Sequence, residues 1–292
     1  MSIDLHTHSI NSDGTLYPKE ILKLATELQL EAISITDHEY LTEIDYHANL
    51  KVISGIEVSV NWEHLEERNK YAGVHLLVYY ISKSDPLNMK LEEVRKQKIE
   101  RNYKVLENLR NIDINIENSE LDLFETKVPG RPHIAKLMVE KKYVSSMNEA
   151  FLKYLGNGKI ENLNSHQINI KEVINLAKES KSLVFLAHPH TLMSNNNSSK
   201  RSNWVNSQFY DYLQKLKSFG LDGVEVYYPG YNQSTKDNLL DLLSELDLMA
   251  SGGSDFHGDN KPNNLLGIGY ENSPIKVPLN LLYKMEDAYA KL

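Results

Sequence analysis

Short apolar runs alternate with longer amphipathic segments along most of the chain. Runs rich in Val, Ile and Leu indicate buried strands, and apolar residues spaced three and four apart indicate helices. We expect strands at Ser2–Leu5, Ala32–Ile35, Val52–Ile56, Val74–Ile81, Leu183–Ala187, Gly223–Val226 and Leu248–Ala250. Strands that alternate with helices predict a parallel sheet with helices outside it, as either a barrel or a doubly wound sheet.

The helical segments carry the spacing of a core-facing stripe. The clearest one begins at Pro18, since proline fits the first position of a helix, and its stripe consists of Ile21, Leu24, Ala25 and Leu28. Further helices are predicted at Lys171–Glu179, Trp204–Phe219, Ser234–Glu245 and Pro278–Ala290.

The alternation of strands and helices stops between Pro86 and Ser165. Only helical patterns occur there, at Met89–Arg110, Ile134–Lys142 and Met147–Leu155. We therefore divide the chain into a barrel domain (residues 1–86 and 166–292) and a helical insertion (residues 87–165). An insertion of this length predicts a lid or a substrate-holding subdomain, and a purely structural insertion is the alternative.

Composition excludes several classes of protein. Hydrophobic residues make up 41% and charged residues 25% of the 292 positions, which is typical of a globular protein rather than a disordered one. No apolar run is long enough to span a membrane, and no secretory signal is visible. The absence of cysteine rules out thiolate ligands and cysteine nucleophiles and fits a cytoplasmic protein. The net charge of −8 argues against binding extended duplex nucleic acid.

Histidines and carboxylates gather at the expected ends of the strands. The chain reads Asp-Leu-His-Thr-His at residues 4–8, and residues two apart in a strand point to the same side. Asp13, His38, Glu57, His188, Asp255 and His257 follow other strands, and His75 begins one. In an α/β barrel this face holds the active site. Since no Lys or Arg lies near these motifs to pair with the buried acids, the pattern predicts a metal cluster, and imidazole with carboxylate suits Mn²⁺, Fe²⁺ or Zn²⁺.

The motifs also resemble those of the PHP (polymerase and histidinol phosphatase) family. The resemblance rests on IDLHTHSINSDGTLYPKEI, AISITDHE, VISGIEVS, LAHPH and ASGGSDFHG. The insertion is similar to that of the bacterial branch that acts on 3′,5′-nucleoside bisphosphates and on short RNA from its 5′ end. That likeness rests on QKIERNYKVLENL, GRPHIAKLMVEKKYVSSMNEAFLKYLGNGK and, more loosely, GVEVYYPGYNQ.

The resemblance implies a fold and a set of ligands. The fold is a distorted seven-stranded (β/α) barrel, and the site holds two to three divalent metal ions, with Mn²⁺ as the leading candidate. By position, the first metal would be held by His6, His8, Glu57 and Asp255, the second by Asp13, His38 and His257, and the third by Glu57, His75 and His188, with Glu57 bridging. All nine positions carry a residue of the expected type.

Phosphoester hydrolysis needs such a cluster, because metals neutralise phosphate charge and generate hydroxide at neutral pH. We expect a metal-bridging hydroxide to attack phosphorus in line with the leaving oxygen, without a protein nucleophile. Asp37, beside His38, is either an orienting residue or a turn former. Gly252 and Gly253 are expected to let the backbone approach the metals.

Three further residues are candidates for substrate binding. Arg131 and His133 lie in a Gly-Pro-rich turn of the insertion, where an arginine fork can meet phosphate, and His190 follows His188 by two residues. Tyr227, Tyr228 and Tyr231 either stack on a base or simply pack a loop. We expect the Lys/Arg run of Arg95–Arg110 to form a solvated helix face and His47, His64 and His166 to lie on the surface.

The leading hypothesis is a metal-dependent phosphoesterase. Its partner would be a 3′,5′-nucleoside bisphosphate or a short single-stranded RNA cut from the 5′ end. A phosphatase for histidinol phosphate or another small phosphomonoester is the alternative within the same class. A non-catalytic metal-binding module is the alternative from another class, and the complete set of ligand-type residues argues against it. The sequence identifies no protein partner.

Overall fold

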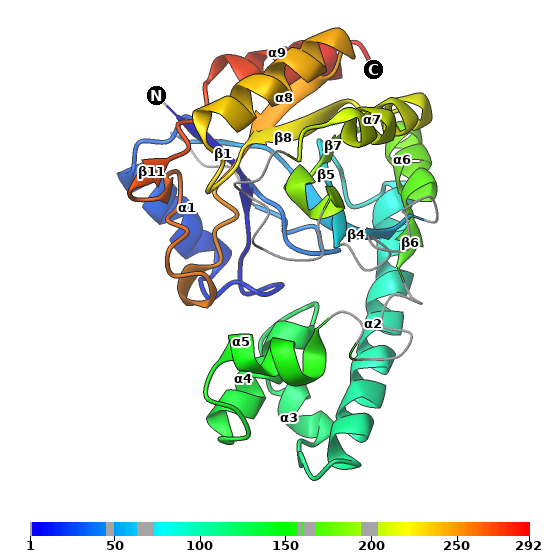
Figure 1. Ribbon diagram of the computed structural model, residues 1–292, viewed down its shortest axis with the longest axis vertical. Coiled ribbons are helices and arrows are strands. Elements are labelled where there is room, and N and C mark those ends of the chain that lie inside the picture. The colour runs from blue at the N-terminus through cyan, green and yellow to red at the C-terminus, as the bar shows by residue number, and fades with distance from the viewer. Residues whose placement is uncertain (1, 45–49, 63–72, 157–158, 160–166, 194–203) are drawn as a thin grey trace.

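The computed structural model describes residues 2–44, 50–62, 73–156, 159, 167–193 and 204–292. His47, His64, His166 and the polar loop Asn195–Arg201 lie outside the described residues. The structure consists of a sheet-containing body with helices around it and a separate group of helices below it (Figure 1).

The described strands and helices follow the predicted alternation. The strands are β1 (Ile3–Thr7), β2 (Ala32–Ile35), β3 (Lys51–Val52), β4 (Gly55–Asn61), β5 (Val74–Tyr79), β6 (Ile168–Asn169), β7 (Leu183–Leu186), β8 (Gly223–Tyr227), β9 (Met249–Gly252), β10 (Gly269–Tyr270) and β11 (Ser273–Pro274). The helices are α1 (Pro18–Glu27), α2 (Pro86–Arg110), α3 (Asn118–Asp122), α4 (Arg131–Glu140), α5 (Met147–Ala150), α6 (Ile170–Glu179), α7 (Ser207–Phe219), α8 (Gln233–Glu245) and α9 (Asn280–Tyr289). A π-helical turn, Phe151–Leu155, continues α5. The predicted strand Val52–Ile56 is in fact divided between β3 and β4.

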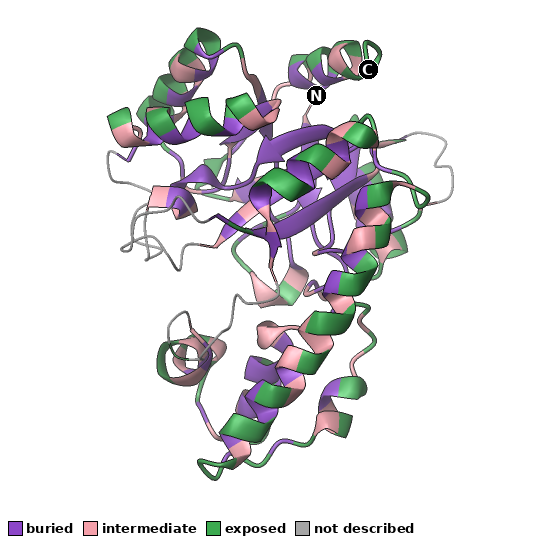
Figure 2. Ribbon diagram, turned by 90° about the vertical axis from the view of Figure 1, so that its right-hand side faces the viewer, coloured by how far each residue is buried: buried purple, intermediate pink, exposed green. Residues whose placement is uncertain are grey.

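The strands form two main sheets, with orders β1-β2-β3 and β6-β4-β5-β7-β8-β9. Two single bridges join the sheets, one from Thr7 in β1 to Phe256 beyond β9 and one from His38 beyond β2 to Glu57 in β4. The arrangement is consistent with a distorted barrel, although the ladders of the described residues do not close into one continuous sheet. Figure 2 shows the strands buried between partly exposed helices.

Strand β5 runs against its neighbours. It pairs antiparallel with both β4 and β7, so the expectation of an all-parallel sheet is wrong here. Only 12 residues separate Asn61 from Val74, and a parallel return needs a crossover that usually includes a helix. The reversal has a consequence for the site. His75, the second residue of β5, lies opposite Ser59 near the carboxyl end of β4, so the start of β5 is at the face where its neighbours end.

The reversal of β5 also sets the course of α2. Strand β5 ends at the opposite side of the body, and α2 begins shortly afterwards at Pro86. With 25 residues, this helix is about 37 Å long. Leu87, Leu91 and Val94 pack in the core of the body, whereas Val105 and Leu106 belong to the separate core of the insertion. Helix α2 therefore passes the strand ends and connects the two cores (Figure 1).

Among the described residues, none of the helices combines the length and the apolar character needed to cross a membrane.

Candidate metal centre

Nine imidazoles and carboxylates from six strands or their adjoining loops converge at one end of the sheets. The structure brings together His6, His8, Asp13, His38, Glu57, His75, His188, Asp255 and His257. Glu57 is the third residue of β4 rather than the residue after a strand, because β4 continues to Asn61. Glu57 nevertheless lies beside His38, because a single β-bridge pairs Glu57 with this histidine beyond the end of β2.

Glu57 lies at the centre of the cluster, with a different set of histidines facing each of its oxygens. Oε1 is 2.8 Å from His75 Nδ1 and 2.9 Å from His188 Nε2. Oε2 faces three imidazoles, with distances of 3.3 Å to His6 Nε2, 3.1 Å to His8 Nε2 and 3.4 Å to His38 Nδ1. Both carboxylate oxygens of Glu57 therefore face the space where the cluster could hold metal.

Asp255 completes the group around His6 and His8. Its Oδ1 lies 3.5 Å from the Nε2 atom of each of these histidines. Its other oxygen, Oδ2, accepts hydrogen bonds from Tyr228 Oη and Lys261 Nζ, both at 2.7 Å. The backbone of Asp255 has a φ of +51°, a sparsely populated conformation that the surrounding contacts hold in place.

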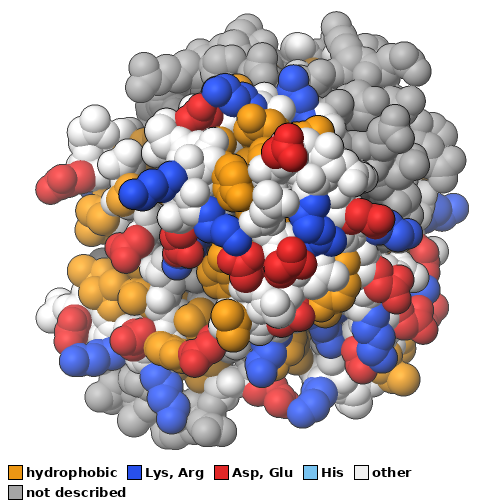
Figure 3. Space-filling view, turned by 90° about the horizontal axis from the view of Figure 1, so that it is seen from below, with side chains coloured by type: hydrophobic (Ala, Val, Ile, Leu, Met, Phe, Trp, Pro, Cys, Tyr) orange, Lys and Arg blue, Asp and Glu red, His pale blue; other side chains and the backbone are white. Residues whose placement is uncertain are grey.

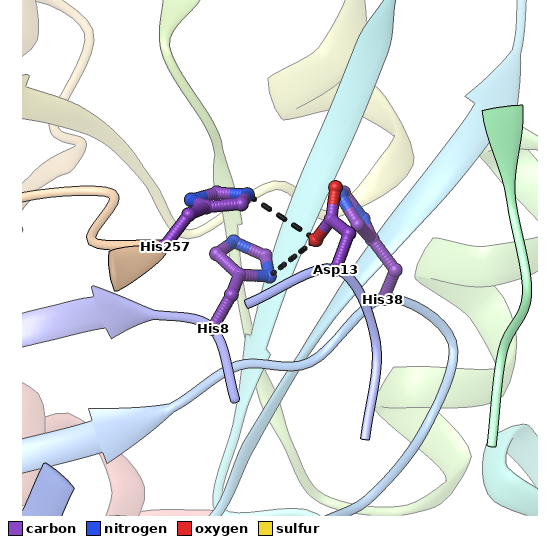
Figure 4. A group of neighbouring side chains, drawn as sticks. All are labelled: His8, Asp13, His38 and His257. Atoms are coloured by element: carbon purple, nitrogen blue, oxygen red, sulfur yellow. Dashed lines mark ion pairs between the residues drawn. The ribbon is translucent and has the colours of Figure 1, made fainter. Parts of the chain in front are cut away.

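A second group surrounds Asp13 (Figure 4). Asp13 Oδ1 is 3.2 Å from His257 Nε2, 3.7 Å from His8 Nδ1 and 3.8 Å from His38 Nε2. One potential ligand atom from each of these four residues lies within 4.8 Å of the others. This group contains Asp13, His38 and His257 of the expected second set together with His8, which also lies beside His6 and Glu57.

The carboxylates stay ionised in this setting. Burial favours the neutral acid, but the histidines facing Asp13 and Glu57 outweigh it and hold the pKa of both carboxyls well below its usual range. Burial is likewise outweighed at Asp255, where Lys261 and His257 hold the carboxyl pKa well below normal. The cluster therefore offers three negative charges to a cation.

The histidines divide into two kinds. Burial lowers the pKa of His38 to about 3 and also lowers the pKa values of His188 and His257, so these imidazoles are neutral at pH 7. Burial acts on His6 and His8 too, but neighbouring acids outweigh it. The pKa of His6 lies well above its usual value, chiefly because of Glu225 and Glu57, and Asp255 and Glu57 raise the pKa of His8 to about 9.

The donor set fits divalent metal ions. Neutral imidazole nitrogens and ionised carboxylates, with no sulfur, are ligands for Mn²⁺, Fe²⁺ or Zn²⁺. His38 Nδ1 is buried and has no hydrogen-bond partner within the part of the chain that the structure describes, as expected of an atom placed to bind a cation. The cluster can therefore bind metal.

Two carboxylates missed by sequence analysis orient the cluster. Glu225 in β8 is fully buried and accepts hydrogen bonds from His6 Nδ1 at 2.9 Å and from the His188 amide at 2.7 Å. The first bond orients the His6 ring so that its Nε2 atom faces Glu57 and Asp255. Asp4 in β1 accepts bonds from the Ser254 amide and hydroxyl. The sequence signal that could have identified Glu225 is a charged residue inside an apolar strand, Val224-Glu225-Val226.

Asp37 acts as an orienting residue rather than only as a turn former. Its carboxylate accepts hydrogen bonds from the Ser9 amide, the Ser9 and Ser12 hydroxyls and the Thr42 hydroxyl. These bonds fix the loop that carries Asp13 against the residue before His38. Gly253 has a different role from the expected one, since a Cβ there would collide with His6, and it lets β9 approach β1.

Arg131 lines a cavity of about 200 Å³ between the cluster and the insertion. Asp13, His38 and His75 border the same cavity, and so do Lys98 and Arg101 of α2. Burial, together with the charge of Arg101, lowers the pKa of Arg131 to about 10, so it remains cationic at pH 7. The prediction that the Lys/Arg residues of Arg95–Arg110 all face solvent is wrong for Lys98 and Arg101. These two residues are three apart and therefore lie on one side of α2, which faces the strand ends.

His133 and His190 are placed differently from Arg131. His133 Nδ1 accepts a hydrogen bond from the Gly130 amide at the start of α4, and its ring packs on Phe124. It is not among the residues that line the Arg131 cavity. His190 is buried, with its Nδ1 2.8 Å from Tyr231 Oη.

The tyrosines that follow β8 are mainly packing residues. Tyr228 and Tyr231 are buried, and their rings lie 5.5 Å apart, in contact with His190 and Trp204. This favours the packing alternative for Tyr231, whereas Tyr228 also lines a cavity beside His188 and Asp255.

Comparison with known proteins gives consistent results. The profile of a family described as "PHP domain" matches residues 4–258. A "5′-3′ exoribonuclease" of Haemophilus influenzae is 28% identical over 262 residues, covering 87% of this chain and 89% of its own. A "3′,5′-nucleoside bisphosphate phosphatase" of Chromobacterium violaceum is 24% identical, covering 95% of both chains. A crystal structure described as a metal-dependent phosphoesterase of Bifidobacterium adolescentis superposes with a TM-score of 0.74 at 23% identity, covering 98% of this chain and 96% of its own, which supports the fold.

Proposed function

The chain belongs to the PHP domain family, and on that basis we propose that it removes the 3′-phosphate of a 3′,5′-nucleoside bisphosphate or releases nucleotides from the 5′ end of short RNA. The chain is a metal-dependent phosphoester hydrolase, as its relatives' names also indicate. The substrate assignment rests on one observation: Lys98, Arg101 and Arg131 line the same cavity as Asp13, His38 and His75. A phosphate held by the cations would leave a second phosphate at the cluster.

The proposed ligands divide into three overlapping groups around Glu57. The first is His6, His8, Glu57 and Asp255, the second is Asp13, His38 and His257, and the third is Glu57, His75 and His188. Bound divalent metals would neutralise the phosphate oxygens and supply a nucleophile at neutral pH. The chain's own residues would hold this assembly rigid, because Glu225 and Asp37 orient the imidazoles and the Asp13 loop.

The cationic wall would bind the phosphate that is not hydrolysed. An arginine fork matches phosphate geometry, and a lysine adds a compact charge. Lys98 is already held in place, since its Nζ lies 2.5 Å from the buried Glu39 carboxylate. Glu39 lines the same cavity, and the pair fixes α2 to the residue that follows His38.

The insertion would form a wall of the site. Besides the Lys98–Glu39 pair, Thr126 Oγ1 donates to the carbonyl oxygens of Asn11 and Ser12, at 3.0 and 2.8 Å. Glu39 directly follows His38, and Asn11 and Ser12 directly precede Asp13, so both contacts tie the insertion to loops that carry cluster residues. We therefore extend the lid proposal for residues 87–165: the insertion excludes water and also steadies Asp13 and His38.

The opposite face of the insertion gives no support for a long RNA track. In Figure 3 the basic and acidic side chains of this lower face are interspersed rather than gathered in one area. A small nucleotide or the first residues of an RNA therefore fit better than an extended polyanion bound along the surface.

The proposal predicts a clear substrate order. With Mn²⁺, 3′,5′-adenosine bisphosphate should be hydrolysed with a kcat/KM at least about tenfold higher than histidinol phosphate, because charge-assisted hydrogen bonds contribute about 1.5–3 kcal/mol each. Histidinol phosphate instead carries cationic groups that the wall would repel. Initial phosphate release measures both rates. A preference for histidinol phosphate would reverse the substrate assignment, and hydrolysis of no phosphoester at all would favour the non-catalytic module.

Substitution of Arg131 tests whether this residue binds the phosphate that is not hydrolysed. Arg131→Met should lower kcat/KM for the bisphosphate by about 10- to 100-fold, the value of one charge-assisted hydrogen bond. Adenosine 3′-monophosphate, which lacks the 5′-phosphate, should be affected much less. Arg131→Lys should recover part of the loss, and Lys104→Met, at an exposed position of α2, is the matched control. Equal losses on both substrates would mean that Arg131 does not recognise the second phosphate.

A further inference from the structure

A second cavity borders the cluster from another side. It has a volume of about 510 Å³ and shares no lining residue with the cavity of Arg131. Its inner wall contains His188 and Asp255, whereas the first cavity is bordered by Asp13, His38 and His75. The cluster therefore opens onto two separate spaces, and neither the cationic wall nor the insertion occupies the second one.

The lining of this cavity suits a nucleotide. Lys261 lies at its edge, with its Nζ donating to Asp255 Oδ2 at 2.7 Å and its side chain 42% exposed. An ammonium carries three donors, so this bond leaves capacity for a phosphate. Asn263 and Tyr270 place an amide and a ring around the same space, and the buried Asn264 amide holds the backbone carbonyls of Ser254 and Asp255 beside it. A volume of about 300–1,000 Å³ is usual for small-ligand pockets.

The two proposed substrates differ in their need for this space. In a bisphosphate, the attacked 3′-phosphate is the end of the molecule. In RNA, the same phosphorus continues through its O5′ atom to the next nucleoside. In both, hydrolysis adds water across the P–O3′ bond: a hydroxyl joins phosphorus, and O3′ leaves with the proton. With the 5′-phosphate at Arg131, the continuing nucleoside must lie on another side of the cluster.

We propose that the cavity of Lys261, Asn263 and Tyr270 is a subsite for the nucleotide that follows the scissile phosphate of RNA. The inference rests on the proposed function and gives the RNA beyond the attacked phosphate a binding place in the structure. Lys261 couples the subsite to the centre, since it contacts Asp255 and also faces the space where the chain would continue.

The test compares two substrates that share the first nucleotide and the bond that breaks. They are 3′,5′-adenosine bisphosphate (pAp) and 5′-phosphorylated diadenosine (pApA). Asn263→Trp places a large ring in the cavity at an exposed position with no role in the cluster. We expect the ratio of kcat/KM for pApA to that for pAp to fall by at least about tenfold, as for a steric clash in a binding pocket. Asn238→Trp, exposed on α8 and outside both cavities, is the matched control and should leave the ratio unchanged.

The outcomes separate the inference from the function on which it rests. If Asn263→Trp reduces both rates equally, the cavity holds a part common to both substrates and the assignment is wrong. An unchanged ratio also overturns it. If the wild-type protein hydrolyses pAp but not pApA, the subsite fails while the phosphatase proposal stands. If it hydrolyses neither, the proposed function fails and the subsite falls with it.

Discussion

Replacing Glu57 with glutamine is expected to reduce phosphoester hydrolysis by about 10³-fold or more, since metal centres contribute several kcal/mol of transition-state stabilisation. Each Glu57 oxygen faces histidines of different groups, two at Oε1 and three at Oε2. Glutamine keeps the volume but removes the charge, and its NH₂ group cannot coordinate a cation. Metal binding and turnover should therefore be lost together.

The measurement is kcat/KM on the bisphosphate together with metal content after dialysis. Glu92→Gln is the matched control, because Glu92 is exposed on α2 and pairs with Lys96 across one helical turn. A Glu57→Gln protein that retains full metal content and more than a tenth of the activity would show that Glu57 does not bridge the site. Circular dichroism of the same preparation separates loss of function from loss of fold.

The nine histidines and carboxylates that the sequence placed at strand ends lie close together in the structure, and most of them do so through local rules. His6 and His8 share a side of β1 through the two-residue period of a strand, and His188, Asp255 and His257 follow strands that run parallel. His75 is different. It begins its strand, and only the reversed direction of β5 explains its place at the shared face. Strand direction depends on long-range pairing, which local patterns do not contain.

The residues that sequence analysis missed depend on tertiary packing. Glu225 alternates with valines, a pattern that marks an unusual charged residue in an apolar strand but does not show which side it faces, and here it points inward to His6. Lys98 and Arg101 lie in a helix rich in Lys and Glu, which predicts a solvated surface. They face a cavity only because α2 crosses from one core to the other past the strand ends. Helix–sheet docking of this kind cannot be read from one sequence.

Metal affinity is expected to rise steeply with pH beyond the range of an ordinary histidine. An imidazole must lose its proton to coordinate a cation. Neighbouring acids raise the pKa of His8 to about 9 against burial, and that of His6 lies well above its usual value. The metal-free protein therefore binds more protons than the metal-bound protein at pH 7, so raising the pH favours binding. Each displaced proton corresponds to about a tenfold gain in affinity per pH unit.

The expected result is an Mn²⁺ affinity that still increases between pH 7 and about pH 8.5, with one to two protons released per binding event. Unperturbed imidazoles, with a usual pKa near 6.5, would give a plateau in this range, and His38, His188 and His257 release none because their pKa values are lowered. Calorimetry in two buffers of different ionisation enthalpy counts the protons directly. Glu225→Gln removes the main group that holds the proton on His6, so this variant should release fewer protons than the wild-type protein. An affinity that is flat above pH 7 would show that the acids around His6 and His8 do not hold those protons in solution.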